Sequence, residues 1–181
     1  MNYKTLTYIL FLFILFHKGL NADEIKINSS KMKILDEGNV ISAINVKANI
    51  PKKKIEIEGD KAIYDKKNKQ LTIINNVKFF DRLKNVYIEA KKVIYNQITD
   101  IVETYGETYI KIEDKYDVYS YDLFYERKSQ KIYSNKETTI KDDRKNVFNL
   151  EENFVFDIKK EIVSSDKTNI IDNNNNEYSF E

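Results

Sequence analysis

The sequence predicts an all-β protein, and three observations carry this prediction. Apolar and polar residues alternate in segments of about four to eight residues that are rich in Ile, Val, Tyr, Phe and Thr, for example at 55–58 and 86–90, and such alternation is typical of half-buried strands. Short polar turns built on Asn, Asp and Lys separate these segments, as at 66–69, 81–85 and 142–146. No stretch sustains the apolar i, i+3, i+4, i+7 spacing of an amphipathic helix.

The chain opens with a segment that has the order of an export signal. Lys4 is its early positive charge, residues 6–16 form a largely apolar run, and Ala22 precedes the first acidic residue, Asp23. A membrane-spanning helix needs about 20 apolar residues, so an uncleaved anchor requires that the polar residues after this run are tolerated. We therefore expect a signal-peptide helix over residues 1–22, with a retained anchor as the alternative, and a mature domain over residues 23–181 that works outside the cytoplasm.

Composition argues against most familiar catalytic chemistries. The chain of 181 residues has no Cys, and its single histidine, His17, lies in the leader. The mature chain therefore has no thiol nucleophile, no Ser–His pair and no imidazole ligand for a metal. With 30 Lys+Arg against 29 Asp+Glu, it also lacks the basic surplus of a general nucleic-acid binder. We expect no catalytic site, no cofactor, no metal ion and no nucleic-acid partner.

The body of the chain repeats with a period of about 30 residues, and a degenerate first copy is expected within residues 32–46. Four columns keep apolar or aromatic character over four copies. They are Tyr64, Tyr95, Tyr125 and Phe156; Ala62, Val93, Leu123 and Phe154; Leu71, Val102, Ile132 and Val163; and Phe79, Ile110, Ile140 and Ile171. A fixed period of this length indicates stacked supersecondary units that bury their apolar faces only against neighbours. We expect the columns to line the inner face of two facing sheets, in a sandwich or an open, elongated roll.

The repeat resembles that of a known family. Residues 57–65 run from an apolar–acidic–small step into the motif A-x-Y-D; a Lys/Asn turn and an apolar strand follow, and the unit closes on Asn75-Asn76-Val77, with Gly38-Asn39-Val40 in the same place in the first copy. This rhythm is similar to the OstA-like repeat of the lipopolysaccharide-transport proteins. The resemblance implies a twisted, V-shaped, two-sheet β-jellyroll over residues 23–181, in a periplasmic protein that passes lipopolysaccharide to the outer membrane of Gram-negative bacteria.

Two members of that family remain open as alternatives. The length is similar to that of an LptA-type bridge protein. The last residues, 170–181, look like the middle of another repeat, as expected for the soluble front of an LptD-type outer-membrane protein that is incomplete here. The implied partners are lipopolysaccharide, other Lpt jellyrolls joined by edge-strand pairing, and the outer-membrane translocon. The candidate edges are the strands around 25–34 and 154–171.

The resemblance implies an apolar groove that holds acyl chains, because each methylene removed from water gains about 0.8 kcal/mol. Repeated, nearly equivalent positions would let a lipid slide along such a track. The candidate lipid-binding residues are Ile57, Ala62, Tyr64, Leu71, Ile73, Phe79, Ile88, Val93, Tyr95, Val102, Ile110, Leu123, Tyr125, Ile132, Ile140, Phe154 and Phe156. The alternative is a structural periplasmic or surface scaffold in which the same residues fill a closed core, and a third reading is a carbohydrate-acting β-sandwich enzyme.

Several polar features have two interpretations each. The Tyr column at 64, 95 and 125 presents hydroxyls at the mouth of the groove or stacks across strands. The Lys runs 52–54 and 91–92 meet lipid phosphates or form solvated faces. Asp100 and Glu103 are paired carboxylates that do acid–base work in an enzyme or are ordinary surface charges.

Overall fold

The structure is a computed structural model that describes residues 24–180, so the expected signal peptide lies outside the described residues. Almost all of it is antiparallel strand, with two short 3₁₀ turns, η1 (Asp36–Gly38) and η2 (Pro51–Lys53). The six long strands are β1 (Lys26–Leu35), β2 (Val40–Ile50), β3 (Ile55–Asp65), β4 (Gln70–Asp81), β5 (Val86–Asn96) and β6 (Ile101–Ile112). The shorter strands are β7 (Tyr116–Tyr121), β8 (Phe124–Glu126), β9 (Lys131–Ser134), β10 (Thr138–Asp142), β11 (Val147–Leu150), β12 (Phe154–Asp157), β13 (Ile162–Ser164), β14 (Thr168–Ile171) and β15 (Glu177–Phe180).

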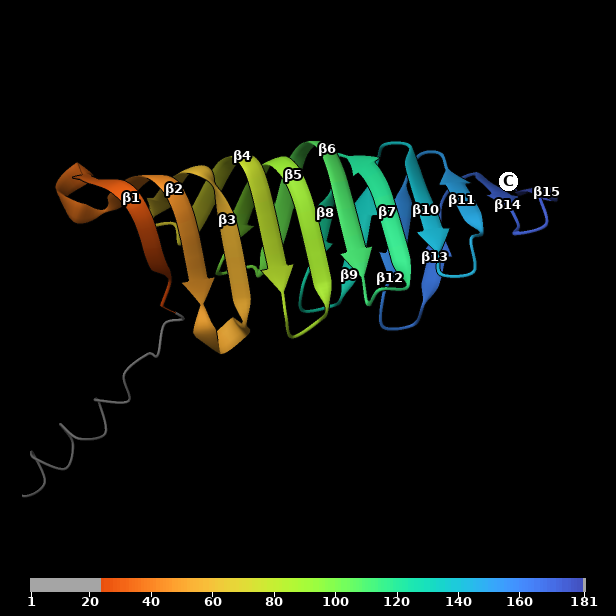
Figure 1. The fold of residues 1–181 in the computed structure, drawn as a ribbon, viewed down its shortest axis with the longest axis horizontal. Helices are drawn as coiled ribbons and strands as arrows, with labels where there is room; N and C mark the ends of the chain where they lie inside the picture. The colour runs from red at the N-terminus through yellow and green to blue at the C-terminus, as the bar shows by residue number, and fades with distance from the viewer. Residues whose placement is uncertain (1–23, 181) are drawn as a thin grey trace, which may run out of the picture.

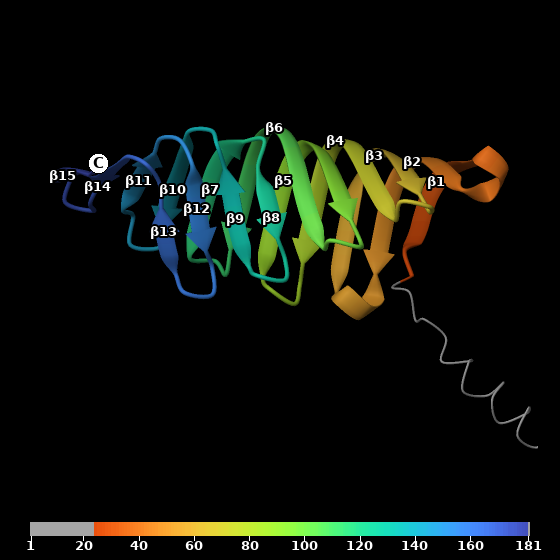
Figure 2. The ribbon, with the colours of Figure 1, turned by 180° about the vertical axis from the view of Figure 1, so that it is seen from behind.

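The strands form an elongated roll of two layers, as the two opposite views show (Figures 1 and 2). β6 is the branching point: residues 107–112 pair with β7, and residues 101–103 pair with β8. The first layer, called layer A, continues through β10, β11, β14 and β15. The second, layer B, continues through β9, β12 and β13. The long strands β2 to β6 each contribute one half to each layer, which confirms the expected all-β, two-sheet jellyroll.

The bend that carries each long strand from one layer to the other has a local backbone cause. The β3–β4 and β4–β5 ladders shift register at the bend, and Asn75 and Asn76 there adopt positive φ values of 64° and 51°, as bulged residues that sharpen a turn of the strand do. Gly59 lies at the same level in β3, where an added Cβ would stand 2.4 Å from Cγ2 of Ile73. The bend therefore requires a residue without a side chain at this point.

The first copy of the repeat is aligned differently from the expectation. Gly38-Asn39-Val40 does not lie at a bend; Gly38 and Asn39 form the turn before β2, where the carbonyl of Asn39 accepts a hydrogen bond from Lys66 N–H at 2.9 Å. Asn45, with φ 52°, occupies the bend of β2 instead. Gly38 supplies the positive φ of the turn, at 97°, and Asn45 supplies that of the bend, because Gly and Asn both tolerate the left-handed conformation.

Opposite the bends, the turns stack into two rows that we call the margins, and the space between them is the mouth. The first margin ends layer A and holds the turns at 51–54, 82–85 and 113–115. The second margin ends layer B and holds the turns at 66–69, 97–100 and 127–130. Backbone hydrogen bonds link successive turns within each row, for example Arg82 N–H to Lys54 O and Gln97 N–H to Lys69 O, both at 3.0 Å. The period of about 30 residues is thus one complete passage from the first margin to the second and back.

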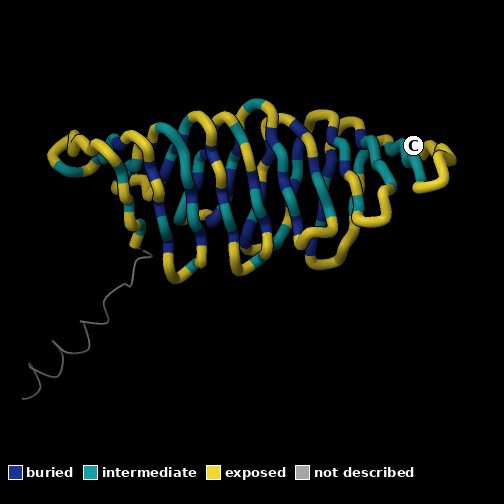
Figure 3. The backbone as a smooth tube through the Cα atoms, viewed as in Figure 1, coloured by how far each residue is buried: buried dark blue, intermediate teal, exposed yellow. Residues whose placement is uncertain are grey.

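Two rows of inward-facing apolar side chains run along the roll and face each other. The row in layer A is Ala48, Ile57, Phe79, Ile88, Ile110, Val118, Ile140, Phe148 and Ile170. The row in layer B is Ile41, Tyr64, Leu71, Tyr95, Val102, Tyr125, Ile132, Phe156 and Val163. Buried residues recur along the strands in the body of the roll, whereas the C-terminal end after Ile158 holds only intermediate and exposed residues (Figure 3).

The last member of one predicted column was wrong. Ile171 pairs with Val147, which in turn pairs with the exposed Lys141 on the outer side, and its neighbour Ile170 continues the inner row instead. A one-residue change in turn length moves a strand's side chains to the opposite face, because their period is two.

The C-terminal half of the roll replaces continuous bent strands by pairs of short ones, such as β7 with β8 and β9 with β10. Buried hydroxyls fill the bend there. The Oγ1 of Thr104 accepts a hydrogen bond from Leu123 N–H at 2.9 Å, and Thr108 donates to Thr104 at 2.8 Å. Ser120 and Thr138 pair at 2.8 Å. These side chains satisfy backbone groups that an unbroken ladder would have paired.

The C-terminal edges also differ from the expectation. β12 lies between β9 and β13, and β14 lies between β11 and β15, so within residues 24–180 the edge strands are β1, β13 and β15. The strand expected around 25–34 is an edge, whereas most of the range 154–171 is interior to a layer.

Candidate functional site: the apolar interior and the charges across its mouth

The predicted groove residues share the inner side of the roll. Of the seventeen candidates, Tyr64 is half-buried, and each of the other sixteen has only 0–1% of its surface exposed. The structure therefore places these seventeen residues on the inner side of the roll, whereas Ile171 of the predicted columns lies on the outer side. Their contact with lipid remains a prediction.

The interior is closed where an open slot was expected. Leu71, Val102 and Ile132 each have 0% of their surface exposed. A surface hollow of about 980 Å³ lies instead on the outer face, where outward residues of layer A such as Lys78, Glu89 and Tyr119 line it. The physical reason for the closure is a set of charged side chains that joins the two margins.

Arg127 is the centre of this set. It follows β8 on the second margin, where its backbone N–H donates to Asp100 O at 3.2 Å. Its guanidinium reaches across the mouth, so that Nε lies 2.7 Å from Oδ2 of Asp81 at the end of β4. Nη1 lies 2.8 and 2.9 Å from the two carboxylate oxygens of Asp100, and Nη2 donates to Lys53 O at 3.3 Å. The side chain is only 4% exposed, so these bonds form out of water.

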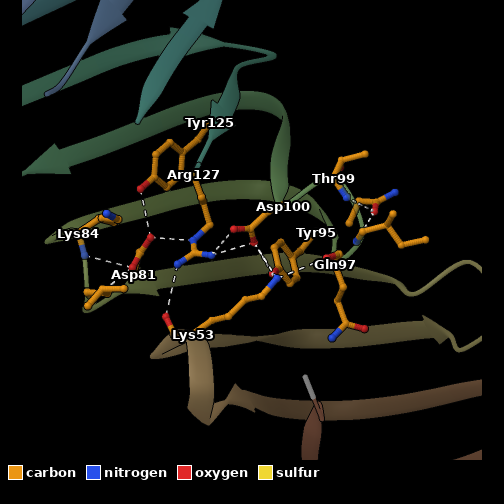
Figure 4. A network of polar contacts seen from close by, with 12 residues as sticks. Lys53, Asp81, Lys84, Tyr95, Gln97, Thr99, Asp100, Tyr125 and Arg127 are labelled. Carbon is orange, nitrogen blue, oxygen red and sulfur yellow. Dashed lines mark hydrogen bonds and ion pairs between the residues drawn. The ribbon is translucent and has the colours of Figure 1, made fainter. Parts of the chain in front are cut away.

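Lys53 makes the second crossing. It ends η2 on the first margin, and its Nζ lies 3.0 Å from Oδ1 of Asp100 on the second margin. It also donates to the hydroxyl of Tyr95 at 3.0 Å and to Gln97 O at 3.3 Å. We call Lys53, Asp81, Asp100 and Arg127 the charged clasp (Figure 4). Its two cations and two carboxylates balance, as a buried cluster requires.

The tyrosine column supplies hydroxyls to the clasp. Tyr95 donates to Oδ1 of Asp100 at 2.7 Å, and Tyr125 donates to Oδ2 of Asp81 at 3.1 Å. Tyr64 donates to the side-chain oxygen of Gln97 at 2.9 Å. Of the two interpretations left open by the sequence, the structure places these hydroxyls at the mouth, while the rings lie in the inner row of layer B.

The protonation states of the clasp follow from these contacts. Burial disfavours the charged guanidinium, but hydrogen bonds to Asp81 and the charges of Asp81 and Asp100 outweigh it, so the pKa of Arg127 is raised. Burial likewise acts to raise the pKa of Asp100, but hydrogen bonds from Tyr95 and Lys53 and the charge of Arg127 hold that pKa below its ordinary value. Burial and the adjacent charge of Asp81 raise the pKa of the Tyr125 hydroxyl. Arg127 and Asp100 are therefore both charged at neutral pH, and the Tyr125 hydroxyl is a neutral donor.

Three sequence interpretations change in the light of this geometry. Lys53 is not part of a solvated Lys run, because its side chain points into the mouth. Asp100 and Glu103 do not form a carboxylate pair: Asp100 is held in the clasp, and Glu103 alternates with the inward Val102 and accepts a hydrogen bond from Tyr105 on the outer face. Lys92 packs over the ring of Tyr105, 4.3 Å from its centroid.

The sequence reasoning missed Arg127 and treated Asp81 as a turn residue, although a signal existed for both. Asp81 continues the parity of Val77 and Phe79, and Arg127 continues that of Tyr125, so period-two alternation already placed both side chains on the inner face. Charged residues at inward positions point to a buried pair, because an unpaired buried charge is costly.

Within residues 24–180, no group of three or more acidic residues could hold a metal ion, and no helix is long and apolar enough to cross a membrane. The described chain is thus an elongated, two-layered antiparallel β-roll whose apolar interior is closed across the mouth by ion pairs.

Comparison with known proteins finds a structural similarity but no sequence match. No family model matches the sequence, and no curated protein matches it. Among solved structures, the chain is similar to LptH from Pseudomonas aeruginosa, described as the LptA homologous periplasmic component of the lipopolysaccharide transport device. The two are 12% identical, the match covers 80% of this chain and 85% of that chain, and the TM-score is 0.48. The functional proposal therefore rests on the residues of this chain.

Proposed function

We propose that this protein is a non-catalytic periplasmic carrier that holds the acyl chains of lipopolysaccharide between its two inner rows and passes the lipid toward the outer membrane. One observation carries the proposal: the two facing rows of apolar side chains run through the described roll without a charged residue. Each repeat places apolar or aromatic side chains at the same positions of the rows. Successive positions along the rows are therefore nearly equivalent, as sliding of an acyl chain requires.

The rows also reach the edges of the roll. Ile34 in β1 pairs with Ile41 at one end of the layer B row and is 65% exposed. Tyr178 and Phe180 in β15 face inward at the other end, and Phe180 is 54% exposed. Exposed apolar side chains beside unpaired strand edges fit a second jellyroll that continues the sheet and the track. On this proposal, residues 23–181 form one jellyroll domain after a signal peptide, either of the LptA type or at the front of an LptD type.

A closed structural scaffold is the second candidate, and the near-zero exposure of the interior favours it. Under that reading, the rows are an ordinary filled core, and no lipid enters between the sheets. The two candidates differ in a single respect that can be measured: whether lipid contacts the inner rows in the cell.

Photo-crosslinking from the interior tests this difference. A photoreactive amino acid is placed singly at Leu71, Val102 or Ile132, and adducts are sought in cells that make lipopolysaccharide. The carrier predicts lipopolysaccharide adducts from these sites. Their absence at all three positions, in variants that retain the circular dichroism and protease resistance of the parent, overturns the carrier and leaves the scaffold.

Matched controls lie one residue away in each strand. Thr72, Glu103 and Tyr133 follow the three inner positions directly and face outward, because side chains alternate along a strand. A carrier gives adducts from the inner set and few or none from the outer set. Equal labelling from both sets indicates nonspecific contact with membrane lipid and counts against the proposal.

A further inference from the structure

We propose that the charged clasp is a lateral gate, whose opening admits lipid to the interior through the mouth. This inference rests on the proposed function, since a gate needs a lipid to admit. It goes beyond that function by assigning the route of entry and the residues that control it.

The clasp holds together two parts of the chain that no backbone ladder joins. Lys53 and Asp81 belong to the first margin, and Asp100 and Arg127 belong to the second. The crossings are Arg127 to Asp81, Lys53 to Asp100, and Arg127 to the carbonyl of Lys53. The two layers are continuous only at the bends, so separating the margins breaks these side-chain contacts and leaves the strand ladders intact.

The clasp differs from the other ion pair that crosses the mouth in the described chain. Lys115 on the first margin lies 2.9 Å from Glu161 on the second, but both side chains are about half exposed, at 46% and 51%. That pair is solvated whether the mouth is open or closed. The clasp side chains are only 0–18% exposed in the closed roll, so they gain most of their contact with water when the margins part.

A closure made of charges is suited to reversible opening. Desolvation of a buried ion pair largely offsets the attraction between its charges, and water stabilises those charges again when the pair separates. A closure made of apolar side chains gains no favourable solvation when it opens, because opening only exposes apolar surface to water. The remaining cost of opening is the wetting of the inner rows, and an acyl chain that enters between them removes that cost. The structure thus couples opening of the clasp to the arrival of an apolar ligand.

The alternative route is end-on. The inner rows reach exposed residues at β1 and β15, so a lipid could enter from a neighbouring jellyroll and pass beneath a clasp that stays shut. The two routes make opposite predictions for a protein whose margins are tied together.

Because the sequence has no Cys, cysteine pairs can be introduced and labelled without reaction at native thiols. Leu83 lies in the first margin between β4 and β5, and Ile98 lies in the second margin between β5 and β6; both are exposed and outside the clasp. The double variant Leu83→Cys/Ile98→Cys spans the mouth. The double variant Leu83→Cys/Lys52→Cys, with both sites on the first margin, is the matched control.

The first measurement attaches nitroxide labels to each pair and follows dipolar broadening by electron paramagnetic resonance as purified lipopolysaccharide is added. A lateral gate predicts that broadening decreases for the pair across the mouth and stays constant for the control pair. A cross-mouth signal that does not change, in a protein whose Leu71 probe forms lipopolysaccharide adducts, overturns the gate and leaves the carrier standing.

The second measurement ties each pair with a short, reducible bismaleimide linker and assays adduct formation from a photoreactive residue at Leu71. The gate predicts that adducts are lost when the cross-mouth pair is tied, return when the linker is reduced, and persist throughout in the control. Undiminished adducts with the margins tied show end-on entry and overturn the gate. Absence of adducts from Leu71, Val102 and Ile132 alike in the untied, folded protein overturns the gate and the proposed carrier together.

Discussion

The middle of the roll and its ends present the same inner rows in different states. Between β3 and β9, the members of the two inner rows are 0–1% exposed, apart from the half-buried Tyr64, and the charged clasp lies over them. At the edge strands β1 and β15, the inward residues Ile34 and Phe180 are more than half exposed. The inner rows are apolar at the ends as well as in the middle, so the repeat does not itself produce closure. The edge strands β1 and β15 have a neighbour on one side only, whereas each strand of the middle has neighbours on both sides and the clasp links its margins.

The largest loss of stability is expected when Arg127, the centre of the clasp, is replaced. Arg127→Met leaves the carboxylates of Asp81 and Asp100 buried beside an apolar side chain. Removing one partner of a buried ion pair costs about 3–5 kcal/mol, and we expect a loss of that order in the free energy of unfolding, measured by urea titration followed by circular dichroism.

The matched control for Arg127→Met is Arg144→Met, in the exposed turn between β10 and β11, which should leave the urea midpoint unchanged. The double variant Arg127→Met/Asp81→Asn should recover part of the loss, because it removes one of the stranded carboxylates. Equal effects of the two arginine substitutions would show that the clasp contributes nothing specific to closure.

A second test compares two members of one row. Leu71 and Ile34 both belong to the layer B row, joined through Tyr64 and Ile41. Leu71→Ala creates a cavity in a closed core and should cost about 2–5 kcal/mol. Ile34→Ala removes a side chain that is already mostly in water, and such surface changes usually stay within about 0.5 kcal/mol. Similar losses in urea unfolding would contradict the contrast between middle and end.

The sequence was sufficient to predict which residues form the inner rows, but it was insufficient to predict the contact between the margins. Alternation and the 30-residue period assign inward positions such as Leu71, Val102 and Ile132, because side-chain direction in a strand depends only on parity. The same rule applied strictly would have placed Asp81 and Arg127 inside. Parity fails where a turn changes length, which is why Ile171 was assigned the position of Ile170.

The approach of Lys53 to Asp100 has no local signature. The two residues are 47 positions apart and belong to different margins, so their distance depends on how sharply the bends fold the long strands. That angle is set by bulges and by the close contact at Gly59, whose combined effect is a property of the packed roll. An open slot was therefore a reasonable expectation from the repeat, and side-chain chemistry at the mouth overrode it.

Acid should weaken the middle before it weakens the strand ladders. The pKa of Asp100 is lowered in the folded protein, where Lys53, Arg127 and Tyr95 face the carboxylate. A group with a depressed folded pKa stabilises the protein above its unfolded pKa, which is about 3.9 for Asp, and that stabilisation is lost as pH falls through the folded value. We expect the urea midpoint to fall as pH is lowered below about 4, and we expect Asp100→Asn to reduce the slope.

Asp65 and Asp172 provide the comparison for the acid experiment. Hydrogen bonds from Asn68 and Asn176, respectively, lower the pKa values of these carboxylates, which lie in turns outside the clasp. Asp172→Asn should leave most of the acid dependence of the urea midpoint in place, whereas Asp100→Asn should remove a larger part of it. The reverse order would assign the acid response to the turns and not to the closed middle.

We expect the smallest effect on stability for the exposed ion pair that crosses the mouth between Lys115 and Glu161. Lys115→Ala removes the ion pair with Glu161, whose charges are solvated in the closed roll. Exposed pairs contribute little because water screens them and two long side chains lose freedom to form them. The urea midpoint should change little at low salt and not at all at high salt, measured beside Arg127→Met in the same buffers. A loss as large as that of Arg127→Met, and equally insensitive to salt, would mean that closure of the mouth does not depend on exclusion of water from its charges.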